Sequence, residues 1–152
     1  MSVTLQPITI LNWIQCLRLK VYDAQREYIA PNHVSLLQAN HPRAIARAIY
    51  HDHTLVGFLM VGKFKYQNES RWFISRVLID KRYQRQGYGR KAMEHIIEFL
   101  RQEHNARAVW MSYTPENSVM LKLASRLGFE PVGEASFGEV MVRLLLEPRR
   151  VT

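Results

Sequence analysis

Residues 72–103 have the sequence WFISRVLIDKRYQRQGYGRKAMEHIIEFLRQE, and this stretch contains the strongest structural signals in the chain. Its first part, Trp72–Ile79, is rich in aromatic and β-branched residues and predicts a β-strand. Its last part, Gly87–Glu103, has apolar residues on one helical face and charged residues on the other, which predicts an amphipathic α-helix. The loop between them is basic and has glycines at positions 87 and 89. A strand, a glycine-containing loop and a helix in this order leave unpaired backbone amides at the helix N-terminus, where phosphate binds.

The rest of the chain is divided into short elements by Pro31-Asn32, His41-Pro42 and several polar turns. We predict strands at residues 3–8, 44–50, 55–64, 72–79, 106–113, 130–135 and 139–146, and helices at residues 12–27, 34–39, 87–103 and 118–127. The order β-α-α-β-β-β-α-β-α-β-β predicts an α/β (α+β) fold with a mixed, mostly antiparallel sheet of about seven strands. One parallel βαβ crossover and helices on both faces are expected. Because no linker or repeat stands out, residues 1–152 predict a single domain.

The chain has a formal net charge of +8, and the positions of the basic residues indicate which class of ligand the charge serves. A basic surface is compatible with nucleic acid, an anionic membrane surface or a polyanionic small molecule. Lys81, Arg82, Arg85, Arg90 and Lys91 crowd around the glycine loop, which favours a phosphate-bearing small molecule. The sequence has no helix-turn-helix, zinc or RNA-recognition signature, and no apolar run approaches the ~18 residues of a membrane span. We therefore expect neither a nucleic-acid nor a membrane partner.

Localisation, metal binding and thiol chemistry can also be predicted. Residues 1–7 have neither the basic segment nor the apolar segment of a signal peptide, which predicts a cytoplasmic protein.

The six histidines show no spacing typical of a metal site, so we predict no metal. Cys16, the only cysteine, falls in an apolar helical stretch and is expected to be a small buried hydrophobe.

The segment Gly87–Ala92 also matches the dinucleotide-binding pattern G-x-G-x-x-A. Three features argue against that interpretation. Six residues separate the predicted strand from the first glycine, and the strand after the helix offers no acidic residue to hold a ribose. The element order is also wrong for a doubly wound parallel sheet.

Residues 77–89 resemble the acyl-CoA-binding motif of the GNAT N-acetyltransferase superfamily. Gln84, Gly87 and Gly89 satisfy its Q/R-x-x-G-x-G/A core. Downstream, a second family pattern is matched by Asn117, Leu123, Gly128 and Phe129. The resemblance covers essentially the whole chain and implies a GNAT fold that uses acetyl-CoA as co-substrate. It also implies cofactor-binding roles: the strand backbone of Val77, Leu78 and Ile79 for the pantetheine arm, Gln84, Arg85, Gln86, Gly87, Tyr88, Gly89 and Arg90 for the pyrophosphate loop, and Asn117 close to the cofactor.

A narrower resemblance concerns the acceptor. Segments within residues 19–39, and the ending Phe137–Met141, are similar to bacterial diamine and spermidine/spermine acetyltransferases. The resemblance implies a small-molecule amine as acceptor, with a polyamine as the narrower expectation. A polyamine needs carboxylates and aromatic faces nearby, and the candidate substrate residues are Asp23, Glu27, Trp72 and Glu139. Each of these acids alone is more typical of a solvated surface residue.

The family pattern is not met at the position of its usual general acid. In many members a tyrosine on the penultimate helix protonates the leaving thiolate. When the family pattern is aligned on Asn117 and Gly128, the residue at that position in this chain is Ala124. Three explanations remain open. Tyr113 at the end of the preceding strand substitutes as the catalytic acid; water protonates the thiolate, whose pKa is ~8.5; or the protein binds coenzyme A and catalyses weakly. We take Tyr113 as the candidate catalytic residue.

The predicted function is acetyl transfer from acetyl-CoA to a primary amine, such as spermidine or spermine. The alternative is an acyl-CoA-binding, catalytically weak sensor or regulatory module. The acceptor itself is not fixed by the cofactor motif, because the same fold serves many acceptors. The apolar last strand, residues 140–146, is compatible with a homodimer.

Overall fold

The computed structural model describes residues 2–9, 11–19, 44–134 and 138–148, and the elements below are taken from these ranges. The predicted helix at residues 34–39 lies outside them. The predicted acceptor residues Asp23 and Glu27 also lie outside the described residues.

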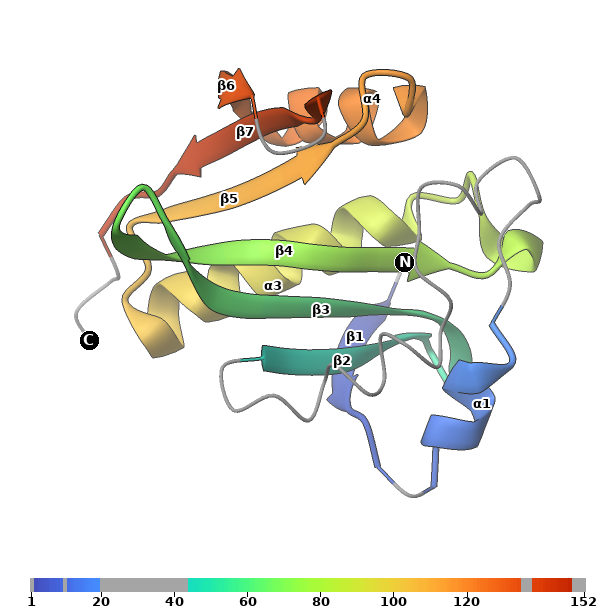
Figure 1. Cartoon of the computed structure of the whole chain (residues 1–152). Coiled ribbons are helices and arrows are strands. Elements are labelled where there is room, and N and C mark those ends of the chain that lie inside the picture. The colour runs from blue at the N-terminus through green and yellow to red at the C-terminus, as the bar shows by residue number, and fades with distance from the viewer. Residues whose placement is uncertain (1, 10, 20–43, 135–137, 149–152) are drawn as a thin grey trace.

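Seven strands and three α-helices are found in this described part of the chain (Figure 1). They follow in the order β1 (Val3–Pro7), α1 (Trp13–Leu17), β2 (Ala44–His51), β3 (Thr54–Tyr66), β4 (Glu69–Ile79), the 3₁₀ turn η2 (Lys81–Tyr83), α3 (Tyr88–His104), β5 (Ala108–Tyr113), α4 (Ser118–Leu127), β6 (Glu130–Glu134) and β7 (Val140–Leu145).

All seven strands form one sheet with the spatial order β1-β2-β3-β4-β5-β7-β6. Every neighbouring pair is antiparallel except β4 and β5, which are parallel and are connected through α3. The predicted mixed sheet with one parallel crossover is therefore confirmed.

The observed bounds agree with the predicted ranges to within about two residues for most elements, and α1 is the clear exception. The helix predicted at residues 12–27 ends at Leu17. The amides of Arg18 and Leu19 donate to the carbonyls of Gln15 and Cys16, three residues back, so the last turn tightens and the helix stops. Leu19 is then buried against the sheet rather than continuing the helical face.

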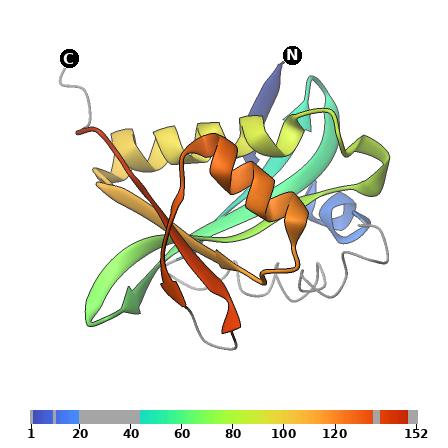
Figure 2. The ribbon, with the colours of Figure 1, turned by 90° about the horizontal axis from the view of Figure 1, so that it is seen from above.

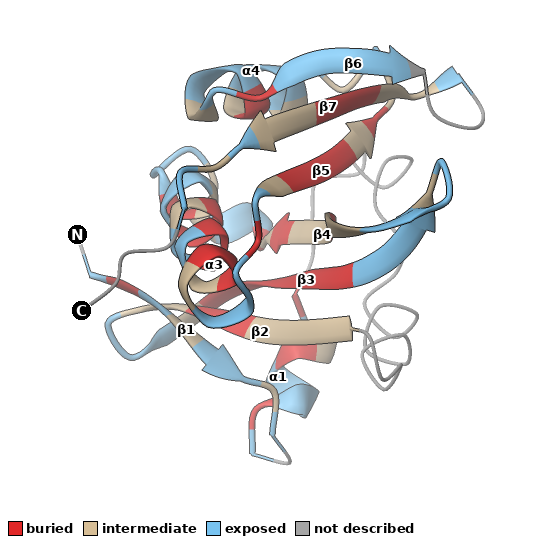
Figure 3. Cartoon of the chain, turned by 90° about the vertical axis from the view of Figure 1, so that its left-hand side faces the viewer, coloured by how far each residue is buried: buried red, intermediate tan, exposed pale blue. Residues whose placement is uncertain are grey.

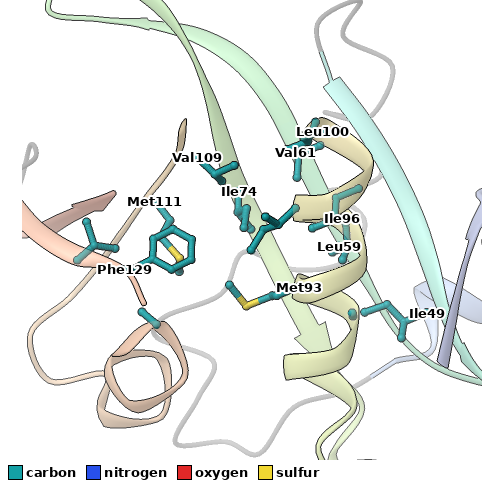
Figure 4. Packing of buried hydrophobic residues seen from close by; sticks show 14 of the residues in the cluster. Ile49, Leu59, Val61, Ile74, Met93, Ile96, Leu100, Val109, Met111 and Phe129 are labelled. Atoms are coloured by element: carbon teal, nitrogen blue, oxygen red, sulfur yellow. The ribbon is translucent and has the colours of Figure 1, made fainter. Parts of the chain in front are cut away.

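The main core lies between one face of the sheet and the helices α3 and α4. Alternate residues of β2 to β5, such as Ile49, Leu59 and Val109, meet the apolar side of α3 (Figures 3 and 4). On α3 the buried residues include Met93, Ile96 and Leu100, which recur at helical spacing. Figure 2 shows α3 and α4 next to each other on this face, where Ala124 and Phe129 join the same cluster.

A smaller core covers the opposite face. Ala48, Phe58 and Leu78 alternate with residues of the main core along their strands, so they face the other way and contact α1. Cys16 of α1 is fully buried here, and burial raises the pKa of its thiol to about 11. The prediction of helices on both faces is confirmed by α1 on one side and α3 with α4 on the other.

β4 and β5 meet and then separate. Their pairing consists of Phe73 opposite Trp110, and both strands lie wholly in the described part of the chain. Beyond this point the two strands diverge toward the N-terminal end of α3 (Figure 1). The register of β4 against β3 shifts between Val61 and Met60, so that Ser75 is an extra residue in β4 at the start of the divergence.

None of the described helices is both long and apolar enough to cross a membrane.

Replacing Gly57 with alanine should destabilise the fold. A Cβ at Gly57 would overlap the backbone oxygen of Leu78, so β3 and β4 would have to separate where the sheet holds the end of β4. We expect a loss of at least ~2 kcal/mol of unfolding free energy, measured by urea denaturation. Gly89→Ala is the matched control, since its Cβ would lie 3.6 Å from Ile79 Cγ1, an ordinary contact. Equal stability of Gly57→Ala and wild type would contradict this explanation of the glycine.

Candidate active site

The N-terminus of α3 is open to an anionic ligand. Its N-cap, Gly87, has a φ of 84° and no side chain that could bond the first amides, and the first turn has no acidic residue. Arg85 also has a positive φ, 64°, which is uncommon for a residue other than glycine. Left-handed residues of this kind turn nearby backbone N–H groups toward one concave side. At the positive end of a 17-residue helix, the arrangement is suited to phosphate.

Gly89, in the first turn of α3, is not required by the packing of the protein itself. The nearest atoms to an added Cβ would be Ile79 Cγ1 at 3.6 Å and Leu123 Cδ2 at 4.0 Å. A glycine in a helix costs up to about 1 kcal/mol relative to alanine. Because no side chain stands at this position, the backbone of the first turn stays accessible to a ligand.

The loop between β4 and α3 is held by polar contacts at its start. Asp80 is buried, and its carboxylate accepts hydrogen bonds from the Arg82 backbone amide at 2.9 Å and from Arg82 Nε at 2.8 Å. This hydrogen bond and the charge of Asp80 raise the pKa of Arg82. Gln84 Nε2 donates to the carbonyl of Ile79 at 2.8 Å, which ties the loop back to the end of β4. The motif glutamine therefore shapes the loop from within.

Tyr88 anchors the other end of the loop. Its hydroxyl donates to Gln86 Oε1 at 2.9 Å. The same oxygen lies 3.1 Å from His51 Nδ1, and it can accept a hydrogen bond from that nitrogen when Nδ1 carries the proton. The rings of Tyr88 and His51 stack with centroids 4.8 Å apart. His51, the last residue of β2, thereby holds Tyr88 and the end of the loop in place.

A groove of about 1320 Å³ runs from this loop across the space between β4 and β5 to the start of β7. It is lined by residues 64–66, 73–77, 79, 83–85, 87–90, 111–114, 117–120, 122, 123, 126, 139 and 141. The opening between the diverging strands therefore connects the helix N-terminus on one face of the sheet with the opposite face.

The groove brings together most of the residues predicted to bind the cofactor. Its lining includes Val77, Ile79, Gln84, Arg85, Gly87, Tyr88, Gly89, Arg90 and Asn117. Two predicted residues contribute no surface to it. Leu78 alternates to the other face and is buried in the smaller core, while the side chain of Gln86 bonds Tyr88.

Trp72, predicted as an acceptor residue, does not line the groove. Its side chain faces α3, because it alternates with Phe73 along β4. The ring lies 4.9 Å from that of His104 at the end of α3, and Lys63 Nζ lies 5.9 Å from its centroid. Aromatic composition alone did not reveal which face of the strand it occupies.

Glu139 is the predicted acceptor residue that the structure brings to the groove. Its Oε2 accepts a hydrogen bond from Ser112 Oγ of β5 at 2.9 Å. Phe64, Tyr66 and Phe73 also line the groove and offer aromatic faces. A groove that contains a fixed carboxylate and aromatic rings is chemically suited to an ammonium group.

Tyr113 lines the groove, whereas Ala124 does not. Both residues belong to the main core cluster, with Tyr113 7% exposed and Ala124 1% exposed. The position where the family pattern has a tyrosine is therefore packed within the core here. Tyr113 is the tyrosine that reaches the groove from the end of β5.

Thr114 and Asn117 line the groove on the same side as Tyr113. Thr114 Oγ1 is inaccessible to solvent and has no hydrogen-bond partner in the described part of the chain. Such a hydroxyl costs free energy unless a ligand bonds it. Asn117 Oδ1 accepts from the amide of Met120 at 3.2 Å and caps α4, and the same residue lines the groove.

Sequence reasoning missed Arg76, Ser112 and Thr114. Ser112 alternates with Met111 and Tyr113 along a strand that was predicted, so the strand pattern contained the signal for its face. Arg76 follows the irregularity at Ser75, which no local pattern indicates.

Comparison with known proteins agrees with this geometry. The model of the acetyltransferase (GNAT) family matches residues 9–129. The spermine/spermidine N(1)-acetyltransferase of Bacillus subtilis (strain 168) is 31% identical over 152 residues, covering 95% of this chain and 100% of the relative. Among solved structures, a domain from Methanocaldococcus jannaschii DSM 2661 has a TM-score of 0.76 at 16% identity, covering 95% of this chain and 99% of that one. The PaiA N-acetyltransferase from Thermoplasma acidophilum in complex with coenzyme A has a TM-score of 0.70 at 13% identity, covering 96% and 100%.

The fold and groove define a transferase that takes its acyl group from a phosphate-bearing cofactor. The chain belongs to the acetyltransferase (GNAT) family. It is an acetyl-CoA-dependent N-acetyltransferase, as the sequence motif predicted.

Within the described residues, no three histidine, cysteine or acidic side chains gather in a way that could hold a metal ion.

Gly89→Asp should separate cofactor affinity from stability. A Cβ at this position meets only ordinary contacts inside the protein, and an acidic residue in the first turn favours a helix, so the unfolding free energy should stay within ~1 kcal/mol of wild type. The new carboxylate would lie next to the first amides of α3 and repel a phosphate group, so we expect coenzyme A to bind at least about tenfold more weakly. Calorimetric titration with coenzyme A measures the affinity. A variant that bound coenzyme A as tightly as wild type would show that the phosphates do not approach this turn.

Proposed function

We propose that this chain transfers the acetyl group of acetyl-CoA to a primary amine of a small molecule, with spermidine or spermine as the first candidates. The observation that carries the proposal is the continuous groove that joins the open N-terminus of α3 to Glu139 through the space between β4 and β5. One end is suited to phosphate and the other to an ammonium group. The name of the relative at 31% identity supports a polyamine as acceptor.

The residues present fit coenzyme A. The amides at the start of α3, with Arg85 and Arg90, would hold the pyrophosphate, and Gly87 and Gly89 leave the backbone accessible to it. The facing edges of β4 and β5 would bond the pantetheine arm at Val77 and Ile79, where the strands no longer pair with each other. Asn117 would bond it from the opposite wall. Bound acetyl-CoA supplies an acetyl thioester, from which the acetyl group passes to a deprotonated amine while the sulfur leaves as a thiolate.

Glu139 would receive the acceptor. An alkyl amine titrates near ~10 and is mostly protonated at neutral pH, so it must lose a proton before it can attack. The Glu139 carboxylate, fixed by Ser112, would bind the ammonium and accept its proton directly or through a water molecule. The rings of Tyr66 and Phe73 would contact the remaining, cationic part of a polyamine.

Tyr113 would protonate the leaving thiolate. It lines the groove from the end of β5, where the strand has parted from β4, and the family position at Ala124 offers no donor. Asn117, which would bond the pantetheine arm, also lines the groove, so the Tyr113 hydroxyl would act next to that arm.

Coenzyme A release, followed with a thiol reagent, tests the proposal. Purified protein would receive acetyl-CoA and, separately, putrescine, spermidine, spermine, a basic peptide and an aminoglycoside. Turnover highest with the polyamines is the expected result. Binding of acetyl-CoA with no turnover on any amine would sink the proposal and favour an acyl-CoA-binding regulatory module.

Glu139→Gln should impair the acceptor half of the reaction. Glutamine keeps the size of the side chain and can still accept from Ser112, but it neither attracts the ammonium nor takes its proton. We expect kcat/KM for the amine to fall about 100-fold, with the KM for acetyl-CoA unchanged. Glu130→Gln, at an exposed position of β6 outside the groove, is the matched control.

Tyr113→Phe should slow turnover most at lower pH. Below ~8.5 the leaving sulfur needs a proton, so loss of the donor should reduce kcat by about 100-fold. Above that pH the thiolate is a stable product, and the difference from wild type should shrink. A pH profile of kcat measures this, and full turnover of the variant at every pH would remove Tyr113 from the mechanism.

A further inference from the structure

Two basic residues of α4, Lys122 and Arg126, line the groove without a charged partner from the protein itself. Both are exposed, and neither forms an ion pair within the described part of the chain. They are four residues apart on one helix, so they lie on the same side of it with Cβ atoms about 5–6 Å apart. One phosphate group can therefore contact both side chains.

This pair of like charges is unfavourable for α4 itself. Like charges at this spacing destabilise a helix, and α4 has the sequence SVMLKLASRL, which contains no acidic residue to compensate. The basic residues at the start of α3 differ in this respect. Glu94 Oε1 lies 3.1 Å from Arg90 Nε, and its Oε2 lies 3.7 Å from Lys91 Nζ. An anion bound between Lys122 and Arg126 would remove a repulsion that the helix leaves uncompensated.

The part of α4 that carries these charges passes beside the phosphate end of the groove. A Cβ added at Gly89, in the first turn of α3, would lie 4.0 Å from Leu123 Cδ2. Leu123 directly follows Lys122 and precedes Arg126 by three residues, so both charges lie within about one helical turn of this contact. The two helices pack next to each other on the same face of the sheet (Figure 2). The pair is therefore a neighbour of the pyrophosphate site.

The order of residues along α4 matches the order of groups along coenzyme A. Asn117, the N-cap of α4, would bond the pantetheine arm. Leu123 lies at the first turn of α3, where the pyrophosphate would bind, and Arg126 is in the last turn of α4. In coenzyme A the pantetheine arm is followed by the pyrophosphate and then by a ribose that carries a 3′-phosphate. The charged group beyond the pyrophosphate is thus expected at the level of Lys122 and Arg126.

The one acidic side chain among the described residues that line the groove lies elsewhere. Glu139 is bonded to Ser112, which alternates with core residues of β5 and so faces away from α3 and α4. The α4 side of the groove is positively charged, while the carboxylate stands at the acceptor end. A phosphate on α4 therefore does not compete with an ammonium group at Glu139.

We propose that Lys122 and Arg126 bind the 3′-phosphate of coenzyme A, so that the enzyme prefers acetyl-CoA to donors that lack this phosphate. The inference concerns the donor half of the reaction and holds for whichever amine accepts the acetyl group. Ammonium and guanidinium groups form charge-assisted hydrogen bonds to phosphate oxygens. Because the thioester is at the far end of the pantetheine arm, the two residues set the affinity for the donor and leave the chemical step unchanged.

Calorimetric titration with coenzyme A and with 3′-dephospho-coenzyme A tests the inference, since the two ligands differ in this phosphate alone. We expect wild type to bind coenzyme A about tenfold more tightly, the order expected for two exposed charge pairs. In the double variant Lys122→Gln/Arg126→Gln, the affinity for coenzyme A should fall to about that for the dephospho form. The affinity for the dephospho form itself should stay at its wild-type value. Glutamine is close to lysine and arginine in helix propensity, so α4 should persist.

The double variant Arg18→Gln/Arg107→Gln is the matched control. It removes the same amount of charge from two exposed positions outside the groove. The control should keep the wild-type preference for coenzyme A, which separates a local contact from a general loss of positive charge. Steady-state kinetics give a second measurement: the Lys122→Gln/Arg126→Gln variant should have a raised KM for acetyl-CoA, with kcat and the KM for the amine unchanged.

The other outcomes are equally informative. Equal weakening of both ligands in the α4 variant would assign the two residues to the pyrophosphate and overturn the inference. Equal affinity of wild type for both ligands would also overturn it, as would a fall in kcat with an unchanged KM for acetyl-CoA. Absence of turnover with every amine, together with a preference for coenzyme A that the α4 variant loses, would remove the proposed acceptor reaction and support this inference.

Discussion

β4 and β5 touch at Phe73 and Trp110 and then part, and the groove exists because of that divergence. On either side, antiparallel pairing holds β4 to β3 and β5 to β7, so each of the two strands keeps one paired edge beyond the point where they part. The joint itself is reinforced on one face by aromatic contacts, with Tyr66 5.6 Å and Phe73 6.4 Å from the Trp110 ring. Backbone groups on the two facing edges are left without strand partners, as on any sheet edge, and an extended chain with amide groups can pair with them.

The same divergence explains why the two ends of the groove have different chemistry. On the face covered by α3, the opening leads to a helix N-terminus that no side chain caps, where backbone amides and basic residues favour phosphate. On the other face it leads to Arg76 of β4, Ser112 of β5 and Glu139, the residue just before β7. A ligand that extends through the sheet joins the two environments, so cofactor and acceptor can approach each other from opposite sides. The buried carboxylate of Asp80 keeps the phosphate loop in register with the end of β4.

Elements with strong local patterns could be predicted from the sequence, and contacts between distant strands could not. The α3 helix was predicted at residues 87–103 and runs from Tyr88 to His104, because an amphipathic repeat of this length has few alternatives. The glycine loop was located for similar reasons. Helix α1 was predicted too long, because apolar spacing continues beyond Leu17 while the last turn tightens to bury Leu19. Trp72 was assigned to the acceptor on composition, whereas its face is set by the strand register. Arg76 follows an irregularity in β4, and the contact of Ser112 with Glu139 joins residues 27 positions apart, so neither had a local signal.

The burial of Cys16 makes the thiol of this protein unreactive, and this low reactivity has a practical use. The side chain is fully enclosed between α1 and the sheet, and its raised pKa keeps the thiol protonated, and therefore a poor nucleophile, at neutral pH. Because the chain has no other cysteine, the folded enzyme should add almost no background to chemistry that detects sulfur nucleophiles. A cysteine introduced at any exposed position would then be the single reactive handle, so fluorophores or spin labels could be attached at one chosen site in an otherwise native molecule.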